Sequence, residues 1–377
     1  MSKETTPVVV SAVRTPQGRE DGALSDVRSE DLSVPLVEEL LERTGVEPDS
    51  VDDLLWGCAQ QRGEQDNNLA RVISLLSPLG ESVPGTTINR WCASSMEAIA
   101  RAADAISAGR RECLLAGGVE SMSRVSMGET MGDLHPELGN LYNVPDLQMG
   151  MTAEKVSREH GVSREAQDEY ALRSHRRAAD ATESGRFDDE LVPIGDLESD
   201  EGIRYDTSLE KLAGLSPVFR SDGTVTAGNA SQISDGAAAT MVTSEAFAAE
   251  HDLEIMAYVG HHAVAGVDPT VMGIGPVPAT RALLSEVGRE TDDYDLVELN
   301  EAFAAQTVYC RRELGIDEAK FNVNGGAIAV GHPLGASGAR LPVTLLHELE
   351  KRGGTRGLAT LCVGFGQGMA IEFERPE

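Results

Sequence analysis

Short hydrophobic runs rich in Val and Leu alternate along the chain with segments in which apolar residues recur at helical spacing. The runs predict buried strands at 7–13, 52–58, 112–118, 237–244, 255–266, 295–300, 357–364 and 368–374. The helical pattern covers 31–44, 66–77, 93–109, 278–288, 301–313 and 336–352. This alternation predicts an α/β protein with largely buried sheets. Pro342 lies inside the last helical pattern and predicts a kink or a later helix start.

The order of these elements occurs twice. Residues 89–118 contain a turn, a helix and a strand, and residues 324–364 contain a glycine-rich turn, a helix and a strand. Corresponding positions are separated by about 243–245 residues, a spacing that indicates an internal repeat. We therefore predict two similar βα halves packed together.

A segment of different character, residues 121–234, lies between the repeats. It contains turns rich in Met, Gly and Pro, a charged helix at 163–181 and an acidic stretch. Because long irregular loops are uncommon in compact domains, we predict an inserted subdomain that covers a ligand site. The first half then comprises 1–120 with 235–256, and the second half comprises 257–377.

The formal net charge is −30, and only five of the 32 basic residues are Lys. Such a balance keeps a protein in solution and argues against nucleic acid as a partner. It also fits a protein that works at high salt, where screening weakens repulsion between like charges. The chain has no apolar run of about 18 residues, so we expect no membrane span. Its start lacks the apolar core of a signal peptide.

The cysteines argue against a disulfide framework. Their number is odd and no Cys-x-x-Cys pair occurs, a pattern that excludes most zinc sites and favours a reducing cytoplasm. The adjacent His261 and His262 point in different directions and have no third ligand nearby, so we expect no metal site. The five cysteines are Cys58, Cys92, Cys113, Cys310 and Cys362.

Cys92 stands at the start of a predicted helix in "INRWCASSMEAIA". Unpaired N–H groups and the helix dipole at such a position stabilise a thiolate, which predicts a lowered pKa. A lone cysteine is more often a small buried apolar residue. This stretch alone leaves both interpretations open.

His332 lies in the glycine-rich stretch "NVNGGAIAVGHPLGASGAR" (322–340). The glycines allow tight turns, and Pro333 stiffens the chain directly after His332. This context favours a functional imidazole over an ordinary core histidine. An imidazole beside a cysteine is able to take the thiol proton.

Two further stretches carry candidate chemistry. "CVGFGQG" (362–368) follows a strand and predicts exposed N–H groups that hold an oxyanion, with Cys362 as a second reactive thiol. No helix follows it, which argues against a dinucleotide site. In "ELNEAFAAQ", Asn300 either caps a helix or orients a water or a substrate carbonyl, and Glu301 is ambiguous. Two cysteines, a histidine and an asparagine together suit acyl transfer through a cysteine thioester.

These stretches resemble the thiolase family over essentially the whole chain. "GTVTAGNAS" (223–231), "SDGAA" (234–238) and "MGIGPVPA" (272–279) also match its signatures. The principal matches are Asn89, Arg90, Cys92, Ser95 and Met96 in the nucleophile block, 300–304 in the NEAFA block, Gly331, His332 and Pro333 in the GHP block, and 362–368 in the Cys-x-Gly-x-Gly-x-Gly block.

The resemblance implies a thiolase fold, in which two duplicated halves form an α/β/α/β/α sandwich with an inserted CoA-binding loop domain. It implies cleavage of 3-ketoacyl-CoA with CoA, or the reverse Claisen condensation. Cys92 would be the nucleophile, His332 its base and Cys362 the acid/base for the acetyl-CoA carbanion. His332 and a water held by Asn300 would form one oxyanion site, and the N–H groups of Cys92 and Gly364 the other.

CoA is implied as a substrate, with no tightly bound cofactor. By resemblance, Ser231 would contact the pantetheine and Met272 would line the acyl pocket. Because CoA is anionic and the chain is acidic, a few arginines must form a local positive patch. Arg204 and Arg220 are the candidates.

Three positions depart from the family pattern, and they affect the expected CoA affinity and chain length. Ser216 replaces a basic residue, Gln232 replaces Gly, and Gln148 stands where some biosynthetic members have His. "WGCAQQ", "NRWCASSM" and "RSHRRA" resemble the fatty-acid-degrading (β-oxidation) branch, with biosynthetic acetoacetyl-CoA formation as the alternative. A scaffold is disfavoured because all four reactive residues are present. The resemblance also implies a homodimer or homotetramer and association with a 3-hydroxyacyl-CoA dehydrogenase.

Overall fold

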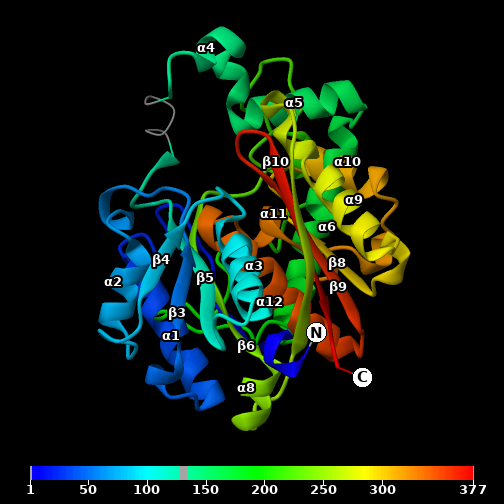
Figure 1. Ribbon diagram of the computed structural model, residues 1–377. Helices are drawn as coiled ribbons and strands as arrows, with labels where there is room; N and C mark the ends of the chain where they lie inside the picture. Colours follow the sequence, from blue (N-terminus) through cyan, green and yellow to red (C-terminus); the bar gives the residue numbers. More distant parts are fainter. Residues whose placement is uncertain (1, 128–133, 377) are drawn as a thin grey trace.

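The computed structural model describes residues 2–127 and 134–376 (Figure 1). Nine of the ten strands in these residues form one hydrogen-bonded path, and β2 lies off the path and pairs with β6. The strands are β1 (Pro7–Arg14), β2 (Gly18–Arg19), β3 (Asp53–Gly57), β4 (Gly85–Ile88), β5 (Cys113–Ser121), β6 (Ser234–Ser244), β7 (Ala257–Gly266), β8 (Leu296–Leu299), β9 (Arg356–Val363) and β10 (Gln367–Glu374). The α-helices of this part of the chain are α1 (Ser29–Thr44), α2 (Leu69–Leu76), α3 (Ser94–Ser107), α4 (Leu138–Leu141), α5 (Met149–His160), α6 (Arg164–Glu183), α7 (Leu209–Ala213), α8 (Glu245–Glu250), α9 (Pro276–Val287), α10 (Ala304–Glu313), α11 (Ala327–Val330) and α12 (Leu334–Arg352).

The strand order confirms the predicted duplication. The path runs β4-β3-β5-β6-β1-β7-β10-β9-β8, so β3-β5-β6-β1 in one half corresponds to β8-β9-β10-β7 in the other. The first pair of each set is parallel and the other pairs are antiparallel. A parallel bridge between Val297 and Phe321 takes the place of β4 in the second half. Pairing of β1 with β7 joins the halves.

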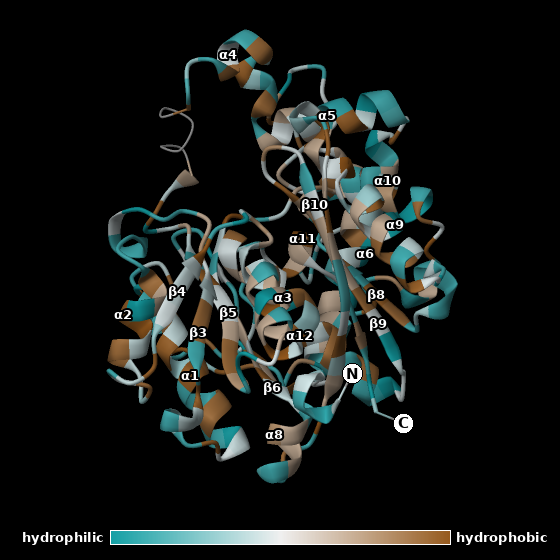
Figure 2. Cartoon of the chain, in the orientation of Figure 1, coloured by the Kyte–Doolittle hydropathy of each residue, from teal (hydrophilic) through white to brown (hydrophobic). Residues whose placement is uncertain are grey.

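Helices cover both faces of the strands, as the predicted layers require. Val9 packs in the cluster around α3 and α12, whereas its neighbours Val8 and Val10 pack in the cluster around α1 and α2. A third cluster joins α9 and α10 to the second half. Figure 2 shows hydrophobic colour along β5, β6 and β8 and hydrophilic colour on the outer side of α10. Within the described residues, no helix is both long and apolar enough to cross a membrane.

The two central helices, α3 and α12, meet at equivalent positions of the repeat. Ala339 donates its backbone N–H to Ser95 Oγ at 2.8 Å, and these residues are 244 apart in sequence. A Cβ on Gly338 would lie 2.5 Å from the backbone nitrogen of Met96, so only glycine allows this approach. α12 begins at Leu334 and continues through Pro342, and the predicted later start is therefore wrong.

Residues 121–234 contain α4, α5, α6 and α7, and α6 is the predicted charged helix (Figure 1). A buried arginine on β1 anchors the end of this segment to the sheet. Arg14 Nε lies 2.6 Å from Glu190 and its Nη1 lies 2.7 Å from Asp200, with all three side chains buried. Because a buried charge is tolerated only when it is paired, this ion-pair cluster fixes the segment against the core.

Candidate active site

Cys92 lies in a tight turn directly before α3. Trp91 adopts a left-handed φ of 47° and donates its N–H to Asn89 Oδ1 at 2.9 Å. Arg90 donates its N–H to Ser94 Oγ at 2.9 Å, and the Ser94 hydroxyl donates to the Trp91 carbonyl at 2.6 Å. These local hydrogen bonds hold the thiol at the start of the helix, where the sequence predicts it.

The Cys92 side chain is 2% exposed, and burial dominates its ionisation. Burial raises the pKa of Cys92 to about 12, although the N–H groups of Gly364 and of Cys92 itself oppose this shift. The lowered pKa expected at a helix start is therefore wrong, because desolvation of the thiolate outweighs the N–H groups. A neutral thiol at physiological pH needs a base to become a nucleophile.

The turn between β9 and β10 brings the second thiol to the first. Cys362 precedes this turn and is fully buried, and burial followed by the charge of Cys92 raises its pKa. At the tip, Phe365 and Gly366 both have positive φ, and the Phe365 ring lies 5.4 Å from the Trp91 ring. The glycines of this stretch thus place Gly364 N–H against the Cys92 thiol.

His332 is held at the start of α12 in one tautomer. Its backbone N–H donates to Ser234 Oγ at 3.2 Å, and Gly331 before it has a φ of 118°. Ser337 Oγ donates to the Pro333 carbonyl at 2.8 Å and lies 2.6 Å from His332 Nδ1. The Ser337 oxygen therefore accepts from Nδ1–H, which leaves Nε2 without a proton.

Burial, followed by the charge of Arg340, lowers the pKa of His332 to about 3. The ring is thus a neutral base over the physiological range. Within the described residues, no hydrogen bond joins it to Cys92 or Cys362. Catalytic hydrogen bonds often tighten only when substrate is bound.

Asn300 follows β8 and does not cap a helix, because α10 begins later, at Ala304, after an extended Phe303. Its Nδ2 lies 3.2 Å from His332 Nε2, so the structure brings these two predicted residues together. Its Oδ1 is buried and has no hydrogen-bond partner within the described residues. A buried amide oxygen in this condition is suited to hold a water, since unpaired buried polar atoms are costly.

Glu301, the ambiguous neighbour, has a structural role. Its carboxylate accepts from the Tyr170 hydroxyl and the Ser174 hydroxyl, both at 2.6 Å, and from Asn322 Nδ2 at 3.0 Å. These contacts tie α6 to the loop before α11 and leave no free carboxylate oxygen for chemistry.

Two of the predicted substrate residues lie beside this site. Met272 is buried in one cluster with Cys362 and Phe303. Ser231 is half-buried and donates its N–H to the Ala302 carbonyl at 3.0 Å, which places it beside the NEAFA block.

The two predicted arginines differ in their partners. Arg220 is exposed and pairs with Asp222 at 3.1 Å. Arg204 is exposed, and within residues 2–127 and 134–376 no ion pair engages its guanidinium. Its backbone N–H donates to His175 Nδ1 at 3.1 Å. Of the two, Arg204 is the one available to an anion.

Sequence reasoning missed two residues that hold the site. Ser337 fixes the His332 tautomer, and its place five residues after His332, in the same glycine-rich stretch, was an available signal. Glu120, fully buried at the end of β5, contacts the start of α12. A carboxylate two residues beyond the predicted strand at 112–118 was the only sequence signal for it.

Comparison with known proteins agrees with this fold. The family model described as "Thiolase, N-terminal domain" matches residues 7–246, and the model described as "Thiolase, C-terminal domain" matches residues 253–375. A 3-ketoacyl-CoA thiolase of Citrobacter koseri is 48% identical over 98% of each chain. A β-ketoadipyl-CoA thiolase of Pseudomonas aeruginosa is 48% identical over 100% of each chain.

Solved structures give the same result. The Bacillus anthracis acetyl-CoA acetyltransferase superposes with a TM-score of 0.91 at 43% identity, covering 99% of both chains. Human mitochondrial 3-ketoacyl-CoA thiolase superposes with a TM-score of 0.91 at 39% identity, covering 100% of both chains. The fold and these matches define an acyltransferase enzyme with the predicted layered fold. The chain belongs to the thiolase family.

Proposed function

We propose that this thiolase cleaves 3-ketoacyl-CoA with CoA through a thioester on Cys92. The observation that carries the proposal is the meeting of both thiols at one turn: Gly364, two residues after Cys362, directs its N–H at the Cys92 thiol. The neutral His332 and the amide of Asn300 lie in contact in the same buried region. CoA acts as a substrate, and the proposal includes no tightly bound cofactor.

In the proposed reaction, His332 and Cys362 each gain one proton and lose one proton. His332 Nε2 takes the Cys92 proton, and the sulfur attacks the 3-keto carbon. The bond between C2 and C3 breaks, and its electron pair leaves as the acetyl-CoA enolate, which Cys362 protonates at C2. The CoA thiol then attacks the Cys92 thioester and gives its proton to Cys362, while His332 returns its proton to Cys92.

Two donor sets would stabilise the oxygens that become negative. The N–H groups of Cys92 and Gly364 serve the tetrahedral intermediate on Cys92. Protonated His332 and a water held by Asn300 Oδ1, which has no hydrogen-bond partner among the described residues, serve the enolate oxygen. Fixed donors in a desolvated site are effective because they need no reorganisation during the reaction.

We expect the substrate to be a longer 3-ketoacyl-CoA, as in degradation. The sequence features of the degradative branch and the relatives named 3-ketoacyl-CoA thiolase support this choice. The biosynthetic alternative is favoured by the structural likeness to an acetyl-CoA acetyltransferase. In residues 121–234, two residues would contact CoA: Ser231, and Arg204, whose guanidinium has no ion pair within the part of the chain that the structure describes.

Thiolysis of 3-ketooctanoyl-CoA and acetoacetyl-CoA should be compared in molar KCl, which screens the charge of −30. We expect kcat/KM to be at least roughly tenfold higher for the longer substrate, because burial of its four additional methylenes, at about 0.8 kcal/mol each, would contribute up to about 200-fold. Activity confined to acetoacetyl-CoA would establish the biosynthetic role instead.

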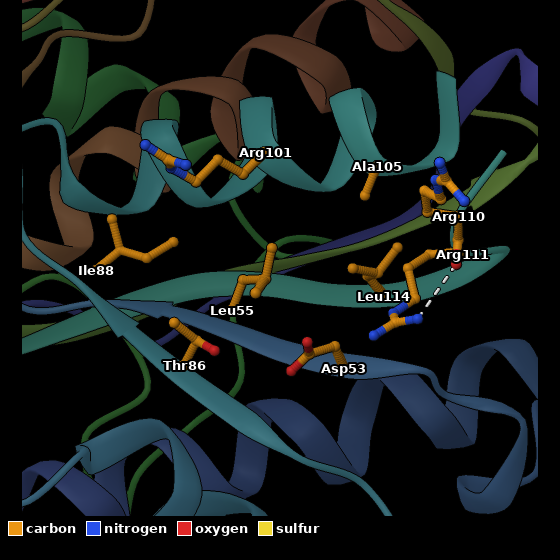
Figure 3. Close-up of a pocket in the computed structure, with 9 residues that line it drawn as sticks. All are labelled: Asp53, Leu55, Thr86, Ile88, Arg101, Ala105, Arg110, Arg111 and Leu114. Atoms are coloured by element: carbon orange, nitrogen blue, oxygen red, sulfur yellow. Dashed lines mark hydrogen bonds between the residues drawn. The ribbon is translucent and has the colours of Figure 1, made fainter. Parts of the chain in front are cut away.

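A homodimer or homotetramer would cover one edge of the sheet. β4 ends the strand path, and Leu75 and Leu76 on the neighbouring α2 are 49% and 58% exposed. Beside β4, a groove of about 520 Å³ lies between α3 and the β3–β4 strands and is lined by Arg101, Arg110 and Arg111 (Figure 3). An open strand edge with exposed apolar neighbours is a surface that proteins normally cover.

Light scattering in molar KCl should give the mass of two or four chains. A Leu76→Glu variant should shift the distribution towards smaller species, because it places a charge at the proposed interface. Wild-type protein with the mass of one chain would contradict this assembly.

A further inference from the structure

A buried carboxylate lies where the two halves of the molecule meet. Glu120, on β5 of the first half, is fully buried, and both its oxygens accept hydrogen bonds. Oε2 accepts the N–H groups of Ala59 and Gly335, each at 2.9 Å. Oε1 accepts the Gln60 N–H at 3.1 Å and Gln65 Nε2 at 2.6 Å. One side chain thus joins β5, the loop after β3 and the first turn of α12.

The backbone around this contact allows little displacement. A Cβ on Gly335 would lie 2.5 Å from the Val119 carbonyl oxygen and 3.0 Å from Glu120 Oε2. A Cβ on Gly118 would lie 2.4 Å from the Gly335 carbonyl oxygen. Two glycines therefore bring α12 against the end of β5, and the Glu120 carboxylate holds the helix there through a charge-assisted hydrogen bond.

The reacting groups belong to different halves. Cys92 lies before α3 in the first half, and His332 lies three residues before Gly335 in the second. No hydrogen bond links the ring to the thiol within the described residues, so contacts between the halves set their separation. Among the hydrogen bonds of the described residues, the Glu120–Gly335 bond is the buried one from β5 that lies nearest in sequence to His332.

A direct electrostatic role in activating the thiol would have the wrong sign. The negative charge of Glu120 raises the pKa of Cys92 and so opposes thiolate formation. A carboxylate that only tuned the thiol would therefore slow the reaction. Any benefit of this carboxylate to acyl transfer would therefore come from the placement of the groups that it contacts.

We propose that Glu120 is a positioning residue for acyl transfer, which acts by fixing the start of α12 and thereby His332 against Cys92. This inference rests on the proposed function for its catalytic consequence. A displacement of about 1 Å in such a pair lowers turnover by roughly 100-fold. Glu120→Gln should therefore lower kcat for thiolysis about 100-fold and change KM less than about threefold.

A double-mutant cycle separates positioning from general structural damage. Its readout is the rate of Cys92 alkylation by iodoacetamide at pH 8, mapped by mass spectrometry, in the wild type, Glu120→Gln, His332→Ala and the double variant. With His332 present, Glu120→Gln should slow alkylation about tenfold, because the base is displaced. In the His332→Ala background it should not slow alkylation, because only removal of a negative charge remains.

The matched control is Glu348→Gln, which alters a buried, hydrogen-bonded carboxylate at the opposite end of α12. It should change alkylation equally with and without His332. If Glu120→Gln folds poorly, Glu120→Asp, which keeps the charge and withdraws the carboxylate, goes through the same cycle with the same expected result.

Equal slowing by the Glu120 variant in both backgrounds would overturn the positioning role. Failure of the proposed function gives a different result, since wild-type protein would then show no Cys92-dependent thiolysis. The alkylation cycle would still report whether Glu120 acts through His332.

Discussion

Replacing Cys92 with alanine should abolish thiolysis, with a fall in kcat of roughly 10⁵-fold or more, while the protein stays folded. The sulfur is the atom that would carry the acyl group, and no other described thiol receives the Gly364 N–H. The side chain is small and its turn is held by hydrogen bonds of neighbouring residues, so the loss of stability should be about 1 kcal/mol.

The matched control is Cys113→Ala. Cys113 is as buried as Cys92 and burial also raises its pKa to about 12, but it packs among apolar residues of β5. This variant should lose stability and keep nearly full turnover. Mass spectrometry after exposure to acetyl-CoA should detect an acyl adduct in wild type and Cys113→Ala, and none in Cys92→Ala. Near wild-type thiolysis by Cys92→Ala would reject the nucleophile assignment.

The periodic elements could be predicted from sequence because each buries one regular face. The repeat spacing was also visible, and the Ser95–Ala339 contact at a separation of 244 residues is its structural counterpart. The ends of the helices and strands were harder to predict from sequence. α10 begins at Ala304 and not at 301, because Phe303 is extended and forms a bridge with Ala230, a tertiary pairing that periodicity does not reveal.

The sequence predicted the site residues that belong to motifs. It did not predict properties, such as the pKa of a thiol, that depend on the segments packed around those residues. Cys92, His332 and Asn300 stand in recognisable blocks. The pKa of Cys92 depends on burial by distant segments, so the local helix start predicted the wrong direction. Glu120 belongs to none of the motifs that indicated chemistry, and its proposed role depends on the N–H group of Gly335, 215 residues away in sequence.

Replacing His332 with alanine should lower kcat/KM for thiolysis by about 10⁴-fold, since it removes both a general base and an oxyanion donor. In the wild type, the low pKa of His332, about 3, keeps the ring neutral, so no loss of activity from its protonation should occur near pH 6.5. Without the ring, deprotonation of Cys92 depends on solvent alone. Because its pKa is about 12, the residual rate should rise about tenfold per pH unit through pH 9.

The same pKa shift predicts a change in stability with pH. The folded pKa of His332 lies below the value of 6.5 expected for the unfolded chain, so the unfolded state binds a proton that the folded state does not. Its contribution to the free energy of unfolding is complete above pH 6.5 and is lost as pH falls towards 3. Urea unfolding at pH 5 and pH 7.5 should therefore show a smaller loss of stability at pH 5 for His332→Ala than for wild type. If the pH–rate profile and the acid destabilisation of His332→Ala both matched those of the wild type, His332 would be neither a buried neutral ring nor the base. Proton removal from Cys92 would then have to be assigned to another group.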